Sequence, residues 1–200
     1  MTTRTGRAKP LSPEDRRTAI LDAVIPLLVE RGAAVTTAEM AQAAGIAEGT
    51  IFRVFDDKNA LLHAAIGKTL DPEPILTALA TIDPNGLLQE QLTEAATILA
   101  ARYEKTTALI GMARSMPGHG KPGPEAMRIA REAMTAVAAA LTNLMRRHEK
   151  HLRVAPEQAA VLLRGLLFAS AHQLLHGDQQ LTPEQLVDVL VNGITTPEEG

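Results

Sequence analysis

The chain of 200 residues contains no cysteine, no tryptophan and few aromatic side chains of any kind. Without cysteine it can form no disulfide, no thiolate metal site and no thiol nucleophile. Its four aromatic residues are Phe52, Phe55, Tyr103 and Phe168. Because 46% of the residues are still apolar, the chain can bury a core built mainly from Leu, Ala, Ile, Val and Met, and this composition favours helices throughout.

Long apolar runs and enzymatic motifs are missing as well. No stretch of about 18 apolar residues could cross a membrane, and the basic N-terminus has no apolar segment behind it, so we expect no secretory signal. No nucleophile elbow, phosphate-binding loop or paired-histidine zinc motif occurs. These absences predict a cytoplasmic protein that is not an enzyme, needs no cofactor and has no membrane partner.

The charge pattern excludes a broad basic surface. The formal net charge is −3, and residues 1–60 hold eight basic and eight acidic side chains. Residues 1–17 alone carry an excess of three positive charges. Any binding to DNA must therefore depend on a few well-placed cations and on helix N-termini.

One stretch, residues 36–58, has the pattern of two short helices around a glycine turn. Thr36 can cap the first helix, and Glu39 can reach back to the Thr36 amide to complete a capping box. Gly45 stands where this helix must end and reverse. A second helix, roughly 47–54, follows with one buried and one outward face. The spacing predicts a helix-turn-helix, whose second helix enters the DNA major groove.

The outward face of this second helix carries the expected DNA contacts. Alanine can touch a thymine methyl and glutamate can accept from cytosine N4, so side chains at the helix start are placed to meet base edges. These are Ala47, Glu48, Gly49 and Thr50. For Glu48 the alternative is an acidic residue that only complements the helix dipole. The side chains of Thr50, Arg53 and Lys58 are suited to holding phosphates.

A set of residues in this region also matches a known pattern: Thr36-Thr37, Met40-Ala41, Ala44-Gly45-Ile46, Gly49-Thr50-Ile51-Phe52, Phe55, Lys58 and Leu61-Leu62, after a helix that ends in Glu30-Arg31-Gly32. It resembles the DNA-binding domain of the tetracycline-repressor (TetR) family of transcriptional regulators. The resemblance is close over residues 15–65, and beyond them the chain matches the family only in its all-helical pattern. The resemblance implies an all-α protein with an N-terminal three-helix headpiece containing the helix-turn-helix and a C-terminal ligand-binding and dimerisation bundle. It also implies a homodimeric repressor that a small-molecule effector releases from a palindromic operator in double-stranded DNA.

Carried over by position, the resemblance makes Thr36, Thr50 and Lys58 phosphate contacts, with Thr37 beside them. One position departs from the pattern. The family usually has tyrosine where Phe52 stands, and Phe52 has no hydroxyl to hold a phosphate. Arg53 or the basic N-terminal arm is then left to compensate.

Cap and turn signals divide the chain into four parts. The predicted parts are a flexible basic arm (1–11), the DNA-binding domain (12–70), the effector-binding and dimerisation domain (71–195) and a tail (196–200). Further helices are expected at 58–69, 74–82, from Asp83-Pro84 onward with a break near Lys105, at 125–151, at 156–176 and at 183–193.

Adaptable apolar side chains with a few polar anchors predict an effector pocket in the C-terminal part. The candidates are Arg102, Tyr103, Met112, Met116, Met127, Met134, Phe168 and His172. The alternative is that the methionines simply fill the core. His172 and His176 have the spacing of metal ligands, as do His148 and His151, but neither pair has an acidic partner in a recognisable motif, so we expect no metal site.

The last two helices carry more apolar residues than one face needs, which predicts a four-helix dimer interface. The expected interface residues are Leu163, Leu167, Ala171, Leu174, Val187, Leu190 and Val191. The alternative is that these helices are internal to a monomer. Two other functions remain open at this point: a DNA-binding regulator or activator without an effector, and an all-helical enzyme or interaction module whose helix-turn-helix resemblance is incidental.

Overall fold

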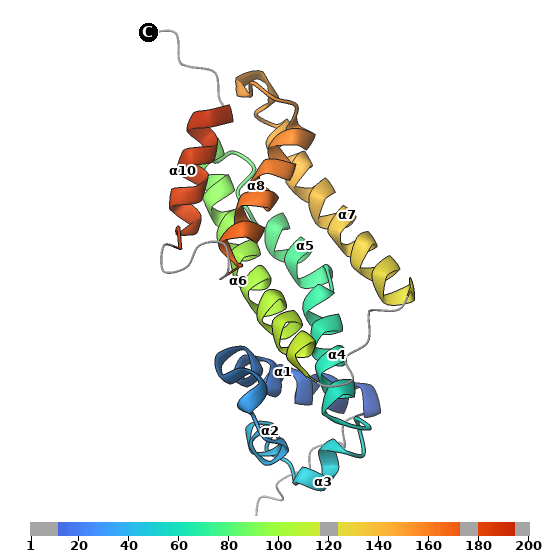
Figure 1. Cartoon of the computed structure of the whole chain (residues 1–200). Helices are drawn as coiled ribbons and strands as arrows, with labels where there is room; N and C mark the ends of the chain where they lie inside the picture. The colour runs from blue at the N-terminus through green and yellow to red at the C-terminus, as the bar shows by residue number, and fades with distance from the viewer. Residues whose placement is uncertain (1–11, 117–123, 173–179, 195–200) are drawn as a thin grey trace, which may run out of the picture.

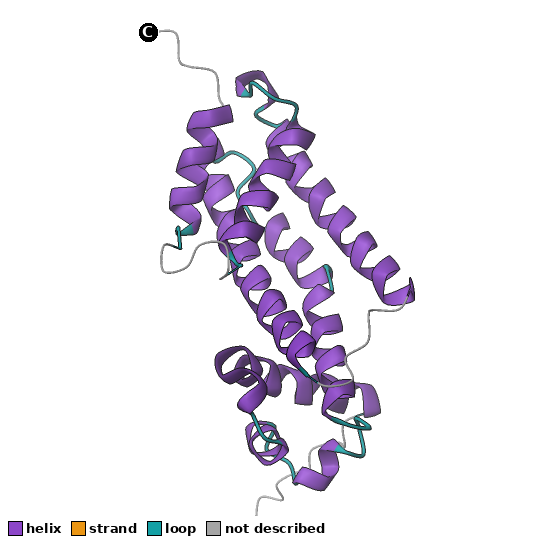
Figure 2. Ribbon diagram, in the orientation of Figure 1, coloured by secondary structure: helices purple, strands orange, loops and turns teal. Residues whose placement is uncertain are grey.

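The computed structural model describes residues 12–116, 124–172 and 180–194, and all regular structure within them is helical (Figure 2). The predicted arm, Leu174, His176 and the predicted tail lie outside these residues. The all-α fold class is confirmed. None of the helices in the described ranges combines the length and hydrophobicity needed to cross a membrane.

The chain forms a headpiece at one end and an elongated bundle above it, with α4 leading from one to the other (Figure 1). Within the described residues the helices are α1 (Pro13–Arg31), α2 (Thr37–Ala43), α3 (Glu48–Ile51), α4 (Lys58–Leu70), α5 (Glu73–Ala80), α6 (Leu88–Ser115), α7 (Pro124–Arg146), α8 (Pro156–Ser170) and α10 (Pro183–Ile194), with 3-10 turns at Gly32–Ala34 and Glu149–His151.

Several helices begin where their capping residues predict. The Ser12 hydroxyl accepts a hydrogen bond from the Asp15 amide at 3.1 Å, and the Asp57 carboxylate accepts one from the Ala60 amide at 2.7 Å. Each cap satisfies a backbone N–H that has no partner within its helix. These local signals are sufficient to place the starts of α1 and α4.

The middle helices differ from the prediction. The Asp83-Pro84 segment forms a turn, closed by a 3.2 Å bond from the Gly86 amide to the Asp83 carbonyl, and α6 begins only at Leu88. No break occurs near Lys105, because the buried stripe of α6 continues past it from Leu99 to Leu109. The predicted helix 125–151 ends at Arg146 and gives way to the second 3-10 turn, and the predicted helix 156–176 is described as far as Ser170.

Two hydrophobic cores hold the molecule together, and α6 belongs to both. Leu92 and Leu99, near its start, pack with α5, α7, α8 and α10. Leu109, Met112 and Ala113, near its end, pack with α1 to α4 in the headpiece. The predicted boundary at residues 70–71 therefore divides the chain in sequence but not in packing. The headpiece core contains side chains from both sides of this boundary.

The contribution of α6 to the headpiece can be measured by truncating Leu109, which is fully buried. Leu109→Ala should lower the free energy of unfolding by about 2–5 kcal/mol because it leaves a cavity in a packed core. The neighbouring Ile110 is 39% exposed, so Ile110→Ala is the matched control and should cost much less. Urea unfolding followed by circular dichroism gives both values, and equal small losses would contradict the shared core.

Candidate nucleic-acid interface

The turn between α2 and α3 is fixed by backbone geometry. Gly45 has a φ of 65°, a left-handed conformation that costs other residues energy. Its amide donates to the Gln42 carbonyl at 3.1 Å, and the Ile46 amide donates to the Ala41 carbonyl at 3.0 Å. This pair of bonds is the Schellman motif that ends a helix. Ile46 then packs on the headpiece core, so the direction in which α3 leaves α2 is defined.

The predicted capping box at the start of α2 is present. The Glu39 carboxylate accepts hydrogen bonds from both the amide and the hydroxyl of Thr36, each at 2.8 Å, and lies 2.7 Å from the Arg31 guanidinium. The bonds from Thr36, and then the contact with Arg31, lower the pKa of Glu39 to about 2. The start of α2 is thereby tied to the end of α1.

The α3 segment is shorter than predicted and is held at its far end by a residue that the sequence did not indicate. Regular helix covers only Glu48–Ile51, and hydrogen-bonded turns continue it to Phe55. The Arg17 guanidinium of α1 lies 4.4 Å above the centre of the Phe55 ring and donates to the Val54 carbonyl at 3.2 Å. Such a cation–π contact adds to the burial of Phe55. An arginine on α1 gives no sequence signal for this contact.

The residues predicted to meet bases lie on the solvent side of α3. Ile51 and Phe55 are almost fully buried and anchor the segment in the headpiece core. Ala47, Glu48 and Gly49 are exposed, and Thr50 is half-buried. Phe52 is 49% exposed and Arg53 is exposed. The outer face of α3 is therefore free to contact a partner, with Phe52 as an unusually large apolar side chain on it.

The predicted phosphate contacts differ in how far they are already occupied. Lys58 donates to the carbonyls of Ala33 at 2.9 Å and Val35 at 2.6 Å, which uses two of the three N–H groups of its ammonium. The Thr36 hydroxyl is engaged by Glu39. The Arg53 amide donates to the Thr50 carbonyl at 3.2 Å, but its side chain makes no hydrogen bond or ion pair within the described part of the chain. Thr37 is the half-buried first residue of α2.

The predicted effector-pocket residues do not surround one enclosed cavity. Met112 and Met116 pack on the headpiece core, while Met127, Met134 and Phe168 are about half-exposed. The aromatic candidates contact one another locally: Phe168 lies edge-on to Tyr103, with ring centres 6.0 Å apart, and 5.9 Å from the ring of His172. Arg102 donates to the Leu70 carbonyl at 2.8 Å.

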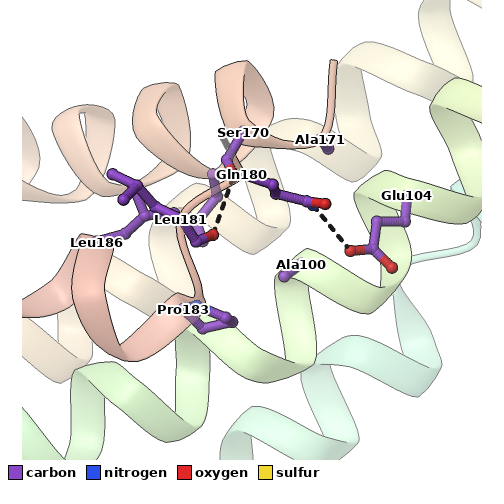
Figure 3. Close-up of a pocket in the computed structure, with 9 residues that line it drawn as sticks. Ala100, Glu104, Ser170, Ala171, Gln180, Leu181, Pro183 and Leu186 are labelled. Atoms are coloured by element: carbon purple, nitrogen blue, oxygen red, sulfur yellow. Dashed lines mark hydrogen bonds between the residues drawn. The ribbon is translucent and has the colours of Figure 1, made fainter. Parts of the chain in front are cut away.

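A hollow elsewhere in the bundle lies between α6, the end of α8 and the start of α10 (Figure 3). The Ser170 hydroxyl donates to the Leu181 carbonyl, and Gln180 donates to Glu104, across it. Its volume is about 20 Å³, room for about one water molecule. It contains none of the predicted pocket residues and is far below the several hundred Å³ of a typical ligand site.

The predicted dimer residues mostly face inward. Leu163, Leu167, Val187 and Leu190 are at most 5% exposed and fill the bundle core of a single chain, so they are unavailable to a partner. Ala171 and Val191 are half-buried. The apolar side chains that do face outward on these helices are others, which the helical period alone could not distinguish: Val161, Leu162, Phe168 and Val189.

Replacing Gly45 tests the turn geometry. A Cβ built on Gly45 has no atom within 4 Å, so Gly45→Ala should lower the free energy of unfolding by about 1–2 kcal/mol through backbone strain alone. Gly49 also has open space around it but lacks the positive φ, and Gly49→Ala should not destabilise the fold. If urea unfolding gave the same change in the free energy of unfolding for both substitutions, the left-handed conformation of Gly45 would not contribute to stability.

Comparison with known proteins agrees with this geometry. Residues 20–65 match the model of a family described as bacterial regulatory proteins, tetR family. Over 90% of its length, the chain is similar in structure to a TetR transcriptional regulator from Streptomyces coelicolor, with a TM-score of 0.63, 19% identity and 99% of that chain covered.

Two further structures extend the similarity. A TetR/AcrR-family transcriptional regulator from Thermobifida fusca has a TM-score of 0.62 and 20% identity over 90% of this chain and 98% of that one. A tetR-family regulatory protein from Rhodococcus has a TM-score of 0.58 and 17% identity over 92% and 98%. The headpiece therefore belongs to the tetR family of bacterial regulatory proteins, and the chain as a whole has the fold of that family's DNA-binding transcriptional regulators.

Proposed function

We propose that the protein is a homodimeric transcriptional repressor that binds a palindromic operator through α3 and is released from it by a small-molecule effector. The observation that best supports DNA reading is the division of the α3 segment into two faces. Ile51 and Phe55 fix it in the core, while Ala47, Glu48 and Gly49 are exposed at its start. In a helix-turn-helix, residues at this position meet the base edges.

Backbone contacts are proposed from the charges and hydroxyls around α3. Arg53 is the freest cation there, and Lys58 keeps one N–H beyond its two carbonyl bonds. Thr37 and Thr50 offer hydroxyls on either side of the turn. Phe52 can contribute an apolar contact to a sugar or a thymine methyl in place of a phosphate bond. With a charge-balanced headpiece, we expect moderate affinity that falls steeply with salt.

Dimerisation is proposed through the outer faces of α8 and α10. Val161 is 64% exposed, Leu162 45% and Val189 63%, and Gly165 lies one turn beyond Val161 on the same face of α8, where it lets another helix approach closely. Val161 and Leu162 also border an open apolar hollow with Val154. A dimer is expected because two recognition segments about 34 Å apart can engage successive turns of DNA, whereas one headpiece makes few contacts.

Release by an effector is proposed to act through α4. Leu61, Leu62 and Ala65 place α4 in the headpiece core, and its last carbonyl, at Leu70, is bound by Arg102 from α6. A ligand that shifts this end of α4 would move the headpiece and change the separation of the two recognition segments. By linkage, the operator must weaken effector binding as much as the effector weakens operator binding.

A regulator without any effector is the alternative that one observation favours. The hollow of about 20 Å³ between α6, α8 and α10 is too small for a ligand. On this alternative the bundle serves only to dimerise the headpieces, and no small molecule changes their affinity for DNA.

The DNA contacts can be tested with a mixed-sequence duplex, because phosphate contacts are independent of sequence. Arg53→Ala should weaken binding and lower the slope of log K against log salt by roughly one. Arg147 is exposed in the turn directly after α7, so Arg147→Ala is the matched control and should leave the slope unchanged. Fluorescence anisotropy over a salt series measures both. An identical slope for Arg53→Ala and the wild type would remove Arg53 from the interface.

The dimer interface can be tested by placing a charge on it. Val161→Glu should shift the protein toward monomers, because two carboxylates would be buried near the two-fold axis without partners. Ile129 on α7 is 48% exposed but lies outside the proposed interface, so Ile129→Glu should remain dimeric. Analytical ultracentrifugation distinguishes the species. A monomeric wild type, or a Val161→Glu variant as dimeric as the control, would contradict the proposed interface.

A further inference from the structure

Arg102 of α6 is a half-buried cation with incomplete hydrogen bonding. Its Nη2 donates to the Leu70 carbonyl at 2.8 Å, but its Nη1 is buried and has no acceptor among the described residues. No carboxylate in the described part of the chain lies within ion-pair distance of it. Buried guanidinium groups are normally paired with acids, because desolvating an unpaired charge is costly.

A second arginine lies in the same region of the bundle. Arg164 of α8 donates through Nε to the Tyr103 hydroxyl at 3.5 Å and forms no ion pair within the described ranges. Burial lowers the pKa of Arg102, and the positive charge of Arg164 lowers it further, against the opposing effects of Tyr103 and Asp71. Arg102 and Tyr103 are consecutive in α6, so both guanidinium groups lie beside the same turn of this helix, and neither forms an ion pair within the described residues.

The side of α8 that carries Arg164 lies between α7 and the outer face of α8 that carries Val161 and Leu162. Glu157, Arg164 and Phe168 are spaced by seven and four residues, which places them on one side of the helix. The first of them, Glu157, pairs with Arg146 of α7 at 2.6 Å. Phe168 is in edge-on contact with Tyr103 of α6. This side of α8 thus borders the space that α6, α7 and α8 share.

The inward stripe of α7 is left uncovered toward its first turns. Val137 and Leu141 on this stripe are buried in the bundle core. Met127 and Met134 lie on the same side by helical period, yet they are 51% and 55% exposed. In Figure 1 this half of α7 diverges from α5 and α6 toward the right of the view. The first half of α7 therefore exposes apolar side chains, and we place them on the side of the bundle that carries Arg102 and Arg164.

We propose that Arg102 and Arg164 bind the anionic group of a small amphipathic effector, a carboxylate above all, whose apolar part lies against Met127, Met134 and Phe168. The proposal rests on the proposed function as an effector-responsive regulator and names the chemical class of its effector. Charge complementarity selects this occupant, because two guanidinium groups without acidic partners favour an anion and donate to it in charge-assisted bonds.

The same arginine couples this site to the headpiece. Arg102 holds the last carbonyl of α4, so an anion that binds its guanidinium competes with, or reorients, the bond that fixes this end of α4. A neutral ligand in the same place would lack this effect.

The test uses the full chain and straight-chain carboxylates from butanoate to decanoate, each matched with the primary alcohol of the same length. Isothermal titration calorimetry should show at least one carboxylate binding about tenfold or more tightly than its alcohol, the scale expected for charge-assisted hydrogen bonds. Arg102→Gln and Arg164→Gln should each remove most of this preference. Arg147→Gln, which changes an exposed arginine, should retain it.

Two variants keep the test valid if one of them is unstable, since Arg102 also bonds to Leu70 whereas Arg164 bonds only weakly to Tyr103. Binding of alcohols as tight as that of carboxylates, failure of every carboxylate to bind, or a preference unchanged in both variants would overturn the inference. Binding of the same preparations to duplex DNA is measured in parallel. If the wild-type protein binds DNA but no carboxylate, only the anionic site is rejected. If the wild-type protein does not bind DNA at all, the proposed function itself is rejected.

Discussion

The shared use of α6 by two hydrophobic cores is the constraint on which the rest of the structure depends. Its first half is buried among the bundle helices, and Leu109, Met112 and Ala113 at its other end complete the headpiece core. An unbroken helix transmits a displacement along its length far better than a flexible linker does. The headpiece is therefore oriented by the bundle, and α4, packed against α6, is the second connection between them.

Within the headpiece, short-range contacts orient the surface that meets DNA. The Schellman turn at Gly45 sets where α3 begins, and the contacts of Arg17 with Val54 and Phe55 hold where it ends. Lys58 donates to the Val35 carbonyl in the connection before α2, and Glu39 accepts from the Thr36 amide at the start of α2. Since these groups are largely occupied by the protein itself, α3 is presented in a fixed direction, and only a few cations remain to neutralise phosphates.

The sequence predicted those features that depend on residues a few positions apart. The cap at Thr36 and the turn at Gly45 are of this kind, and so is the helix-turn-helix itself. It could not predict features set by distant neighbours. The contact between Arg17 and Phe55 joins segments far apart in the chain. Leu163 and Val187 were expected at a dimer interface but are covered by other helices of the same chain, because hydrophobic period identifies an apolar face without saying what covers it. The direction of Arg102 toward Leu70 depended on tertiary packing in the same way.

The central claim is that the exposed face of α3 reads DNA as one half of a two-fold symmetric dimer. In-vitro selection of bound fragments from a random duplex pool tests this claim most directly. The account predicts a palindromic consensus whose half-sites are centred about one helical turn apart, or a multiple of it. Recovery of no consensus, or of a single half-site without a symmetric partner, would contradict it.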